Sequence, residues 1–307
     1  MTIQYSPAEL DPSVALDPHG IPSPRASSSG GASTAAHAVP PAPRARSSRL
    51  GGAASSLGWC LLGLGVAMGI WALGAAQVPD LPGPGETISV MREMIADPFY
   101  DRGPNDKGVG RLLWASLQRV GKGFLMATVI GVPVGLLIGA SRRAWRAANP
   151  IVQLLRPVSP LAWFPIWLVA FKDSDQAAVW VIFITALWPL VINTAAGAHD
   201  VPADQRDVAR VFRFGRIAYL RHVLIPNTLP SIVTGMRLSM GIGWMVIVAV
   251  EMLSGTSGIG NATWQWYNGL DLPKVAAGII FIGLLGLLLD LLFLRLARAV
   301  AIEEVSA

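Results

Sequence analysis

The chain has 307 residues, of which 52% are hydrophobic and only 14% are charged, and its mean hydropathy is +0.50. This balance excludes a soluble globular domain of that length, because so much apolar surface has to face something other than water. The net charge of +5 does not indicate nucleic-acid binding, since the basic residues collect beside the apolar runs instead of forming a separate basic surface. We therefore expect a protein embedded in membrane lipid, with no nucleic-acid partner.

Residues 1–50 differ from the rest of the chain. They are rich in Pro, Ala, Ser and Gly and show no apolar periodicity, which is typical of a disordered segment. A signal peptide would place its apolar run within about the first 30 residues, where this chain carries Pro, Asp and Ser instead. We therefore expect a disordered tail that remains on the protein and stays in the cytoplasm.

Apolar runs of membrane-spanning length recur six times along the chain. They lie near residues 57–77, 112–140, 150–171, 177–198, 229–253 and 275–299. About 20 helical residues, at 1.5 Å each, cross a hydrocarbon core of about 30 Å. The sequence predicts an all-α, polytopic membrane protein with about six transmembrane helices. Residues 51–110 hold the first helix and a loop, residues 111–300 form the core, and residues 301–307 are a short C-terminal end.

The distribution of arginine predicts how these helices are oriented. The clusters are Arg142, Arg143 and Arg146 in one loop, Arg206, Arg210, Arg213, Arg216 and Arg221 in a second, and Arg295 with Arg298 after the last run. Cytoplasmic loops carry an excess of Lys and Arg. Loop 78–110 is acidic, and loops 172–176 and 254–274 are poor in Arg, so all three are predicted to be external. Both termini are then cytoplasmic.

The chain lacks the residue patterns of a catalytic or metal site. Its one cysteine, Cys60, lies in the first apolar run, and its four histidines are scattered, so no metal site is predicted. The string nearest to a phosphate-binding loop, Gly121-Lys122-Gly123, lies in an apolar run and lacks the first glycine and the hydroxyl of that motif. We expect no catalytic residue and no cofactor in this chain.

The segment from Asp200 to Pro230 is amphipathic. Val208, Val211 and Phe212 recur at helical spacing with arginines between them. A helix lying on the lipid surface would have the same pattern.

Within that segment, DVARVFRFGRIAYLRHVLIPNTLP resembles the coupling-loop motif of bacterial ABC importer permeases, which has a Glu-Ala-Ala start, a Gly four residues on and an Ile-x-Leu-Pro ending. The matching positions are Asp207, Val208 and Ala209 at the start, and Val223, Ile225 and Pro226 at the end. Arg213 stands where the motif has Gly, and Gly215 comes two residues late. The resemblance implies a short helix that docks on separate ABC ATPase subunits, which would carry ATP and Mg.

Other segments resemble a narrower branch, the permeases for nitrate, bicarbonate, taurine and alkanesulfonates. They include GVPVGLLIGAS, RPVSPLAWFPIWLVAF and GIGWMVIVAVEML, and the external string DPFYDRGPNDKG is most similar to nitrate and bicarbonate permeases. The resemblance implies the MetI-like fold of type I ABC importer permeases, with residues 111–300 as the permease core, in a bacterial inner membrane. It also implies a second copy of the chain and an external solute-binding protein as partners.

The resemblance further implies a translocation pathway for a small anion. Nitrate is preferred, with nitrite, cyanate, bicarbonate, taurine and alkanesulfonate as alternatives. From another class, an ion-coupled secondary transporter would need intramembrane acids or broken helices in two related halves, and the sequence shows no such repeat. A membrane-anchored structural protein would leave the coupling-loop pattern unexplained.

The third apolar run is predicted to be a broken helix. Pro157, Pro160 and Pro165 each remove a backbone donor, and carbonyls freed in a membrane must be buried in protein or line a cavity. A kink that serves packing alone is equally possible. The resemblance favours a pathway, with Trp163 and Phe164 as gate residues.

Neutral donors suit a small monovalent oxyanion, because they bind it without a full countercharge that would slow its release. Such donors in the apolar runs are Trp188, Asn193, Thr194 and Trp244. Each of them is more often satisfied in helix packing, so the alternative of a structural role stays open.

Arg119 and Glu251 are charges inside apolar runs. A charge in hydrocarbon needs a counter-ion, a watery path or a route to the surface, and Arg119 lies about 12 Å from the end of its run at 1.5 Å per residue. We expect Arg119 to pair with Glu251 near the external gate. Lys122, one turn deeper, is the alternative partner of Glu251 or a ligand for the anion.

Overall fold

The computed structural model describes residues 49–78, 80–103, 106–155 and 157–306, with side chains described from residue 58 to residue 299. The predicted tail therefore lies outside the described residues, except for its last two positions. The chain divides into residues 1–57 and 58–307, and the fold below is that of the second unit.

The described residues are mainly helical. The long helices are α1 (Arg49–Gln77), α3 (Val109–Gly139), α6 (Ser174–His199), α9 (Ile225–Ser254) and α11 (Leu272–Ser306). The shorter ones are α2 (Pro84–Ala96), α4 (Arg142–Leu155), a 3₁₀ turn at Pro160–Trp163, α5 (Phe164–Phe171), α7 (Ala203–Val211), α8 (Arg216–Tyr219) and α10 (Ile259–Asn268). A π turn at Leu220–Leu224 joins α8 to α9.

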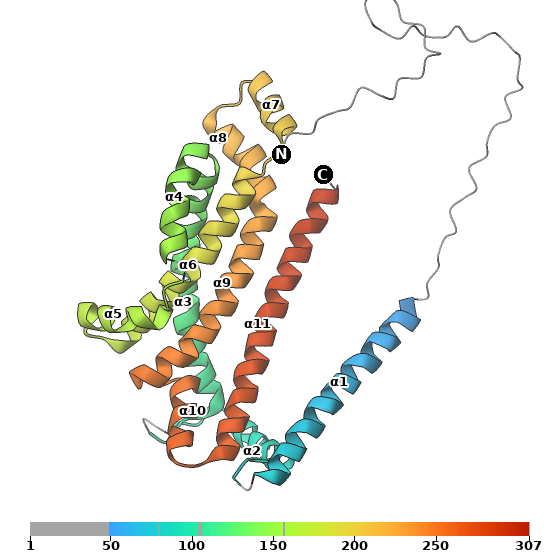
Figure 1. The fold of residues 1–307 in the computed structure, drawn as a ribbon, viewed down its shortest axis with the longest axis vertical. Helices are drawn as coiled ribbons and strands as arrows, with labels where there is room; N and C mark the ends of the chain where they lie inside the picture. The colour runs from blue at the N-terminus through green and yellow to red at the C-terminus, as the bar shows by residue number, and fades with distance from the viewer. Residues whose placement is uncertain (1–48, 79, 104–105, 156, 307) are drawn as a thin grey trace, which may run out of the picture. The chain divides into compact units, whose positions relative to one another are not determined.

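Helices α3, α6, α9 and α11 run alongside one another, with α7 and α8 at one end and α10 and α2 at the other (Figure 1). We call these the α7 end and the α10 end. Five helical stretches are long and apolar enough to cross a membrane: Gly58–Gln77, Val109–Gly139, Ser174–His199, Arg216–Ser254 and Leu272–Ala299. A sixth span is formed if Arg142–Leu155 and Pro160–Phe171, which meet at 87°, count as one. The predicted all-α polytopic class is confirmed.

The third predicted segment differs from the expectation in two ways. Arg142, Arg143 and Arg146 do not lie in a loop, because they form the first turns of α4. The break falls between Leu155 and Pro160, whereas Pro165 stands in the first turn of α5. A proline there removes a donor that has no helical partner in any case, so Pro165 does not break a helix.

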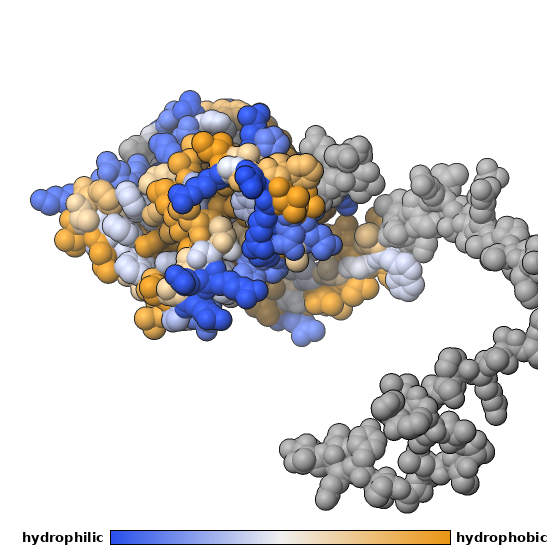
Figure 2. All heavy atoms as spheres, turned by 90° about the horizontal axis from the view of Figure 1, so that it is seen from above, coloured by the Kyte–Doolittle hydropathy of each residue, from blue (hydrophilic) through white to orange (hydrophobic). Residues whose placement is uncertain are grey.

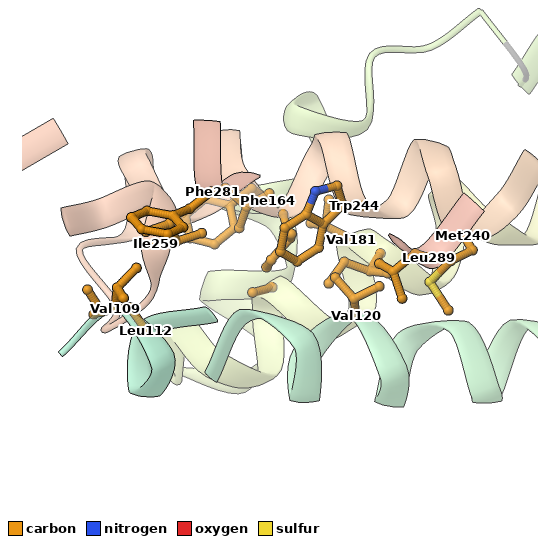
Figure 3. Close-up of a cluster of buried hydrophobic side chains, with 14 of the residues drawn as sticks. Val109, Leu112, Val120, Phe164, Val181, Met240, Trp244, Ile259, Phe281 and Leu289 are labelled. Carbon is orange, nitrogen blue, oxygen red and sulfur yellow. The ribbon is translucent and has the colours of Figure 1, made fainter. Parts of the chain in front are cut away.

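The largest cluster of buried side chains lies where α3, α6, α9, α10 and α11 meet. Val120, Val181, Trp244, Ile259 and Phe281 are among its members (Figure 3). Apart from α6, these helices still leave large apolar side chains exposed, such as Leu125 and Leu137 on α3 and Leu288 on α11. Because exposed apolar side chains on a membrane-spanning helix are solvated by lipid tails, both the buried and the exposed faces of these helices are apolar.

A row of glycines on α3 brings α6 into close contact. A Cβ at Gly131 would meet Leu187 and Leu190, one at Gly135 would meet the Thr194 side chain, and one at Gly139 would meet the backbone of Ala195. Small residues at spacing of four allow such an approach between membrane helices. In the structure, α6 is therefore packed closely against this row of glycines.

We expect Gly135→Val to destabilise the bundle by about 1–3 kcal/mol, since overpacking forces side chains and backbone to shift. Gly121→Val is the matched control, because it changes the same helix at a position where a Cβ meets nothing within 4 Å. Thermal unfolding of the two purified variants in detergent measures the difference. Equal melting temperatures would contradict the close contact between α3 and α6.

Candidate functional site

Glu251 is a carboxylate with no exposed surface. Its Oε1 atom lies 2.8 Å from Nη1 of Arg119, and its Oε2 atom accepts hydrogen bonds from Ser116 Oγ at 2.8 Å and from the Gly260 backbone N–H at 3.0 Å. The carboxylate on α9 is thus met from α3 and from α10. Because each of its oxygens has a donor, the charge can be buried without a large unpaired desolvation cost.

Two glycines make room for this carboxylate. A Cβ at Gly258 would collide with the carboxyl group of Glu251, and a Cβ at Gly260 would collide with the backbone of Val248. Gly255, with φ 68°, ends α9 in the left-handed conformation that glycine adopts at no steric cost. The glycines after α9 therefore fold the chain back so that the start of α10 donates to Glu251.

Arg119 also bonds to a second acid, Asp175. Its Nε and Nη2 atoms lie 2.8 Å and 2.7 Å from the same oxygen, Asp175 Oδ1. Asp175 stands in the first turn of α6, where the side chain of Asp173 caps the helix by accepting from the backbone N–H groups of Asp175 and Gln176. The cap and the first turn hold Asp175 over Arg119.

Three of the cavities in the described part of the structure lie along α6. The α10-end cavity, of about 260 Å³, is bounded by Gln118, Arg119, Lys122, Asp175, Gln176 and Trp180. The middle cavity, of about 370 Å³, is bounded by Pro160, Trp163, Thr185, Trp188, Pro189 and Asn193 among others. The α4 cavity, of about 550 Å³, is bounded by Trp145, Asn149, Gln153, Pro157 and Ile192 among others. The middle cavity shares Ile192 with the α4 cavity.

One ridge of α6 links the three cavities. Gln176 and Trp180 line the first, Ile184 and Trp188 line the second, and Ile192 lines the second and third. Side chains four apart form a continuous ridge on a helix. Pro189 removes the donor that would bond to the carbonyl of Thr185, and both residues line the middle cavity.

A stack of aromatic rings stands beside the α10-end cavity. Trp180 stacks on Trp167 and Phe171 of α5, with ring centroids 5.2 Å and 5.5 Å away, and meets Phe183 edge-on. Trp180 also lines the α10-end cavity, and Ile184, one turn further, lines the middle cavity. The stack thus borders the ridge between these two cavities.

The structure brings together some predicted pathway residues and separates others. Pro160, Trp163, Trp188 and Asn193 line the middle cavity, whereas Pro157 lines the α4 cavity. Asn193 Nδ2 donates to the Pro189 carbonyl at 2.7 Å. Thr194 Oγ1 is buried beside Gly135 and has no hydrogen-bond partner among the residues that the structure describes.

Phe164 and Trp244 lie away from these cavities, in the buried cluster of Figure 3. The indole N–H of Trp244 donates to the Ile282 carbonyl at 3.0 Å, so the structural alternative holds for this residue. Trp244 also borders a smaller cavity beside the ion pair of Arg237 with Asp290, whose bonds are 2.6 Å and 2.8 Å long.

At the α7 end, the predicted coupling segment contains the short helix α7. After it, Arg213 has φ 52°, the Arg213 backbone N–H donates to the Arg210 carbonyl, and the Phe214 N–H donates to the Ala209 carbonyl. This is a Schellman C-cap, whose left-handed residue is usually glycine. The position where the chain departs from the family motif is thus one whose backbone conformation favours glycine.

The α7 end is rich in arginine. Arg206 fixes the turn before α7 by donating to the carbonyls of His199 and Val201, and Arg210 pairs with Asp207. Seen from this end, hydrophilic residues gather with hydrophobic patches between them (Figure 2). Val211 and Phe212 are exposed here. Their apolar surface is free for a partner.

Membrane-spanning helices, a row of cavities along α6 and a short capped helix beyond the bundle define a multi-pass membrane permease. The chain belongs to the family of binding-protein-dependent transport system inner membrane components, which matches residues 131–302. Membership of this family rules out the ion-coupled secondary transporter. The permease acts in the inner membrane, with a solute-binding protein and an ATPase as the partners that this type of system implies.

Two groups of relatives are similar over most of the chain. The nitrate import permease protein of Leptolyngbya laminosa is 44% identical over 239 residues, 78% of this chain and 86% of that protein. The bicarbonate transport system permease protein of Synechococcus elongatus is 44% identical over 225 residues, 72% of this chain and 81% of that protein. The inward-facing MetNI methionine ABC transporter has a similar fold, with a TM-score of 0.57 and 21% identity over 62% of this chain and 95% of that one.

Sequence reasoning missed Ser116, Asp175 and Gly260 as partners of the buried pair. Ser116 stands three residues before Arg119, on the same face of a helix, so that spacing was an available signal. No signal in the sequence pointed to Asp175 or Gly260, because their positions depend on how α6 and α10 pack. Lys122 lines the α10-end cavity, and within the described part of the chain no ion pair involves it.

We expect Glu251→Gln to destabilise the protein by about 3–5 kcal/mol, because it leaves Arg119 short of a buried counter-ion. Asp207→Asn is the control: it breaks a pair whose side chains are 64% and 78% exposed, which is worth about 0–1 kcal/mol. Thermal unfolding in detergent compares them.

The double change Arg119→Glu with Glu251→Arg tests the pair itself. Transport in the double variant should exceed that of either single variant, because the swap restores opposite charges. The pairing has no functional role if the double variant transports no better than the singles.

Proposed function

We propose that this chain is the membrane-spanning permease subunit of an ATP-driven importer for a small monovalent oxyanion, with nitrate as its substrate. The observation that carries the proposal is the similarity to nitrate import permeases along most of the chain. The chemistry of the middle cavity supports it. Trp163, Trp188 and Asn193 line this cavity, and they offer amide and indole donors without a full countercharge.

Bicarbonate is the second candidate, because bicarbonate permeases match the chain about as extensively. Both anions are planar and monovalent, so neutral donors in the middle cavity suit either. The uptake of labelled nitrate can be tested for competition by the remaining candidates, which are nitrite, cyanate, taurine and alkanesulfonate. In such importers the external binding protein contributes to the choice of anion, and we assign it that role here.

The proposed coupling element runs from Asp207 to Pro226, that is, from the second half of α7 through α8 and the π turn to the first residues of α9. Docked there, an ATPase subunit carrying ATP and Mg would supply the hydrolysis. The ending of the motif supports this placement: Val223 and Leu224 are buried in one cluster with Ala209, so movement of α7 would be passed to the start of α9. This chain would carry no cofactor of its own.

We further propose that the α7 end faces the cytoplasm and that the α10 end is external. The support is the arginine content of the α7 end, since cytoplasmic segments are enriched in Lys and Arg. Both chain ends would then be cytoplasmic. The three cavities are bounded by helices of one chain, and a second copy facing them across a two-fold axis would enclose a path between the two.

Gly215→Ile should uncouple transport from ATP hydrolysis while the protein remains in the membrane. Gly215 caps α8 with extended backbone (φ −64°, ψ 162°), and a Cβ there meets nothing within 4 Å. Because its Cβ meets no atom of this chain, we expect the added bulk to act on a docked partner. Gly83→Ile is the matched control, because Gly83 caps α2 with similar angles (φ −76°, ψ 163°) and equally open space.

Both variants are assayed for anion-stimulated ATPase activity and uptake in vesicles that hold the complete importer. Stimulation of the ATPase should be lost in Gly215→Ile and kept in the control Gly83→Ile. Asp207→Lys should have the same effect as Gly215→Ile, because it reverses a charge on α7. If Gly215→Ile and Asp207→Lys both show normal stimulation, the ATPase does not dock on this segment.

Deletion of this chain should abolish uptake of ¹⁵N-labelled nitrate at micromolar external concentration in cells that carry the system. Restoring the chain should restore it, and excess unlabelled nitrate should compete more strongly than bicarbonate or taurine. If labelled nitrate uptake is unchanged while labelled bicarbonate uptake is lost, bicarbonate is the substrate.

A further inference from the structure

The guanidinium of Arg119 has an inner and an outer edge in this structure. On the inner edge, Nη1 donates to Glu251 Oε1 and to the Ser257 carbonyl, both at 2.8 Å. On the outer edge, Nε and Nη2 converge on Asp175 Oδ1. The Arg119 side chain is only 11% exposed, so both edges are held in fixed directions.

The two acids that meet these edges are in contrasting environments. Glu251 has no exposed surface and is bonded on both oxygens, whereas the Asp175 side chain is 62% exposed and borders the α10-end cavity. Among the described residues no hydrogen bond reaches the second oxygen of Asp175. The inner pair is therefore built into the core, whereas the carboxylate of the outer pair lies at the surface and can turn into the cavity without uncovering Glu251.

The outer edge has the geometry of an oxyanion site. Two parallel N–H groups of a guanidinium bind two oxygens of a planar anion side by side, and a carboxylate is one such anion. The cavity adds the amides of Gln118 and Gln176 and the ammonium of Lys122. A volume of about 260 Å³ holds a small anion with several waters, since a water occupies about 30 Å³ in the liquid.

The charges around the cavity match a monovalent anion. Arg119 and Lys122 contribute two positive charges and Glu251 one negative charge, which leaves one positive charge when Asp175 has turned away. With Asp175 in place, the sum is zero. A singly charged anion that replaces Asp175 restores neutrality, whereas a doubly charged anion does not.

We propose that the outer edge of Arg119 is an anion-binding site of the permease, that Asp175 occupies it as an internal substitute, and that the transported anion displaces Asp175. The proposal rests on the proposed function, because it takes a planar monovalent oxyanion as the ligand. Competition from Asp175 weakens binding at this site, so the anion can leave it again, and the ridge of α6 leads from this site to the middle cavity. Asp175 thereby sets how strongly the permease retains its substrate.

Asp175→Asn tests the proposal, because it removes the competing charge from an exposed position. The purified full-length permease is titrated with sodium nitrate, and binding is followed as a nitrate-dependent rise in melting temperature. Asp175→Asn should bind nitrate about tenfold more tightly than the unchanged protein, since a charge-assisted contact no longer competes. Sodium sulfate at equal ionic strength should produce no such rise.

Two further variants keep the result specific. Asp200→Asn removes an exposed carboxylate at the other end of α6 and should leave nitrate binding unchanged. Lys122→Gln, also at an exposed position, should weaken binding in the Asp175→Asn background by about tenfold, because it removes one of the two cations.

The outcomes separate this site from the proposed function. If Asp175→Asn and the unchanged protein respond to nitrate alike while cells still take up labelled nitrate through this chain, the Arg119 site is wrong and the function stands. If Asp175→Asn binds sulfate as well as nitrate, the charge argument is wrong. Tighter nitrate binding in Asp175→Asn, reversed by Lys122→Gln, supports the site even where uptake assays favour bicarbonate.

Discussion

A carboxylate without contact to water constrains how the α10 end of this protein is assembled. Glu251 is an acid in a membrane-spanning helix, and a buried charge is tolerated only when its oxygens are met by donors and a counter-ion. Those groups come from α3, which supplies Ser116 and Arg119, and from the start of α10, which supplies the Gly260 N–H. Moving α3 would leave the charge unpaired, and moving α10 would remove one donor from it. The need for Gly258 and Gly260 follows from the same requirement, because side chains at either position would push the donors away.

Helix α6 combines two roles on two of its faces. One face packs against the glycines of α3, where the backbones of the two helices approach closely. This contact fixes the position of α6. Another carries the ridge from Gln176 to Ile192 that borders the cavities. A rigidly packed helix can hold Trp180 and Trp188 in place without help from the residues that they face. The similarity to nitrate and bicarbonate permeases covers most of the chain, including this ridge. The likeness to a methionine transporter supports the fold alone.

The α7 end is built on a different principle. The C-cap of α7 and the bonds of Arg206 satisfy the backbone groups locally, so this short helix keeps its shape with few buried contacts. Apolar side chains such as Val211 and Phe212 stay exposed as a result. An element that is locally ordered but incompletely buried is suited to binding a separate subunit. Arg213 occupies the left-handed position there at some cost, since a side chain is less favourable than glycine at positive φ.

The sequence by itself determined the helical membrane class, the positions of most apolar spans and the amphipathic character of α7, because each depends on residues near one another in the chain. It also predicted Arg119 opposite Glu251, since hydrocarbon leaves a charge few partners. The tertiary structure alone decided that Phe164 and Trp244 turn into the core and that Asp175 occupies the outer edge of Arg119. Asp175 lies 56 residues from Arg119 and Gly260 nine residues from Glu251. Which of the many polar groups at such separations meet is set by helix packing, and no local pattern in the sequence encodes it.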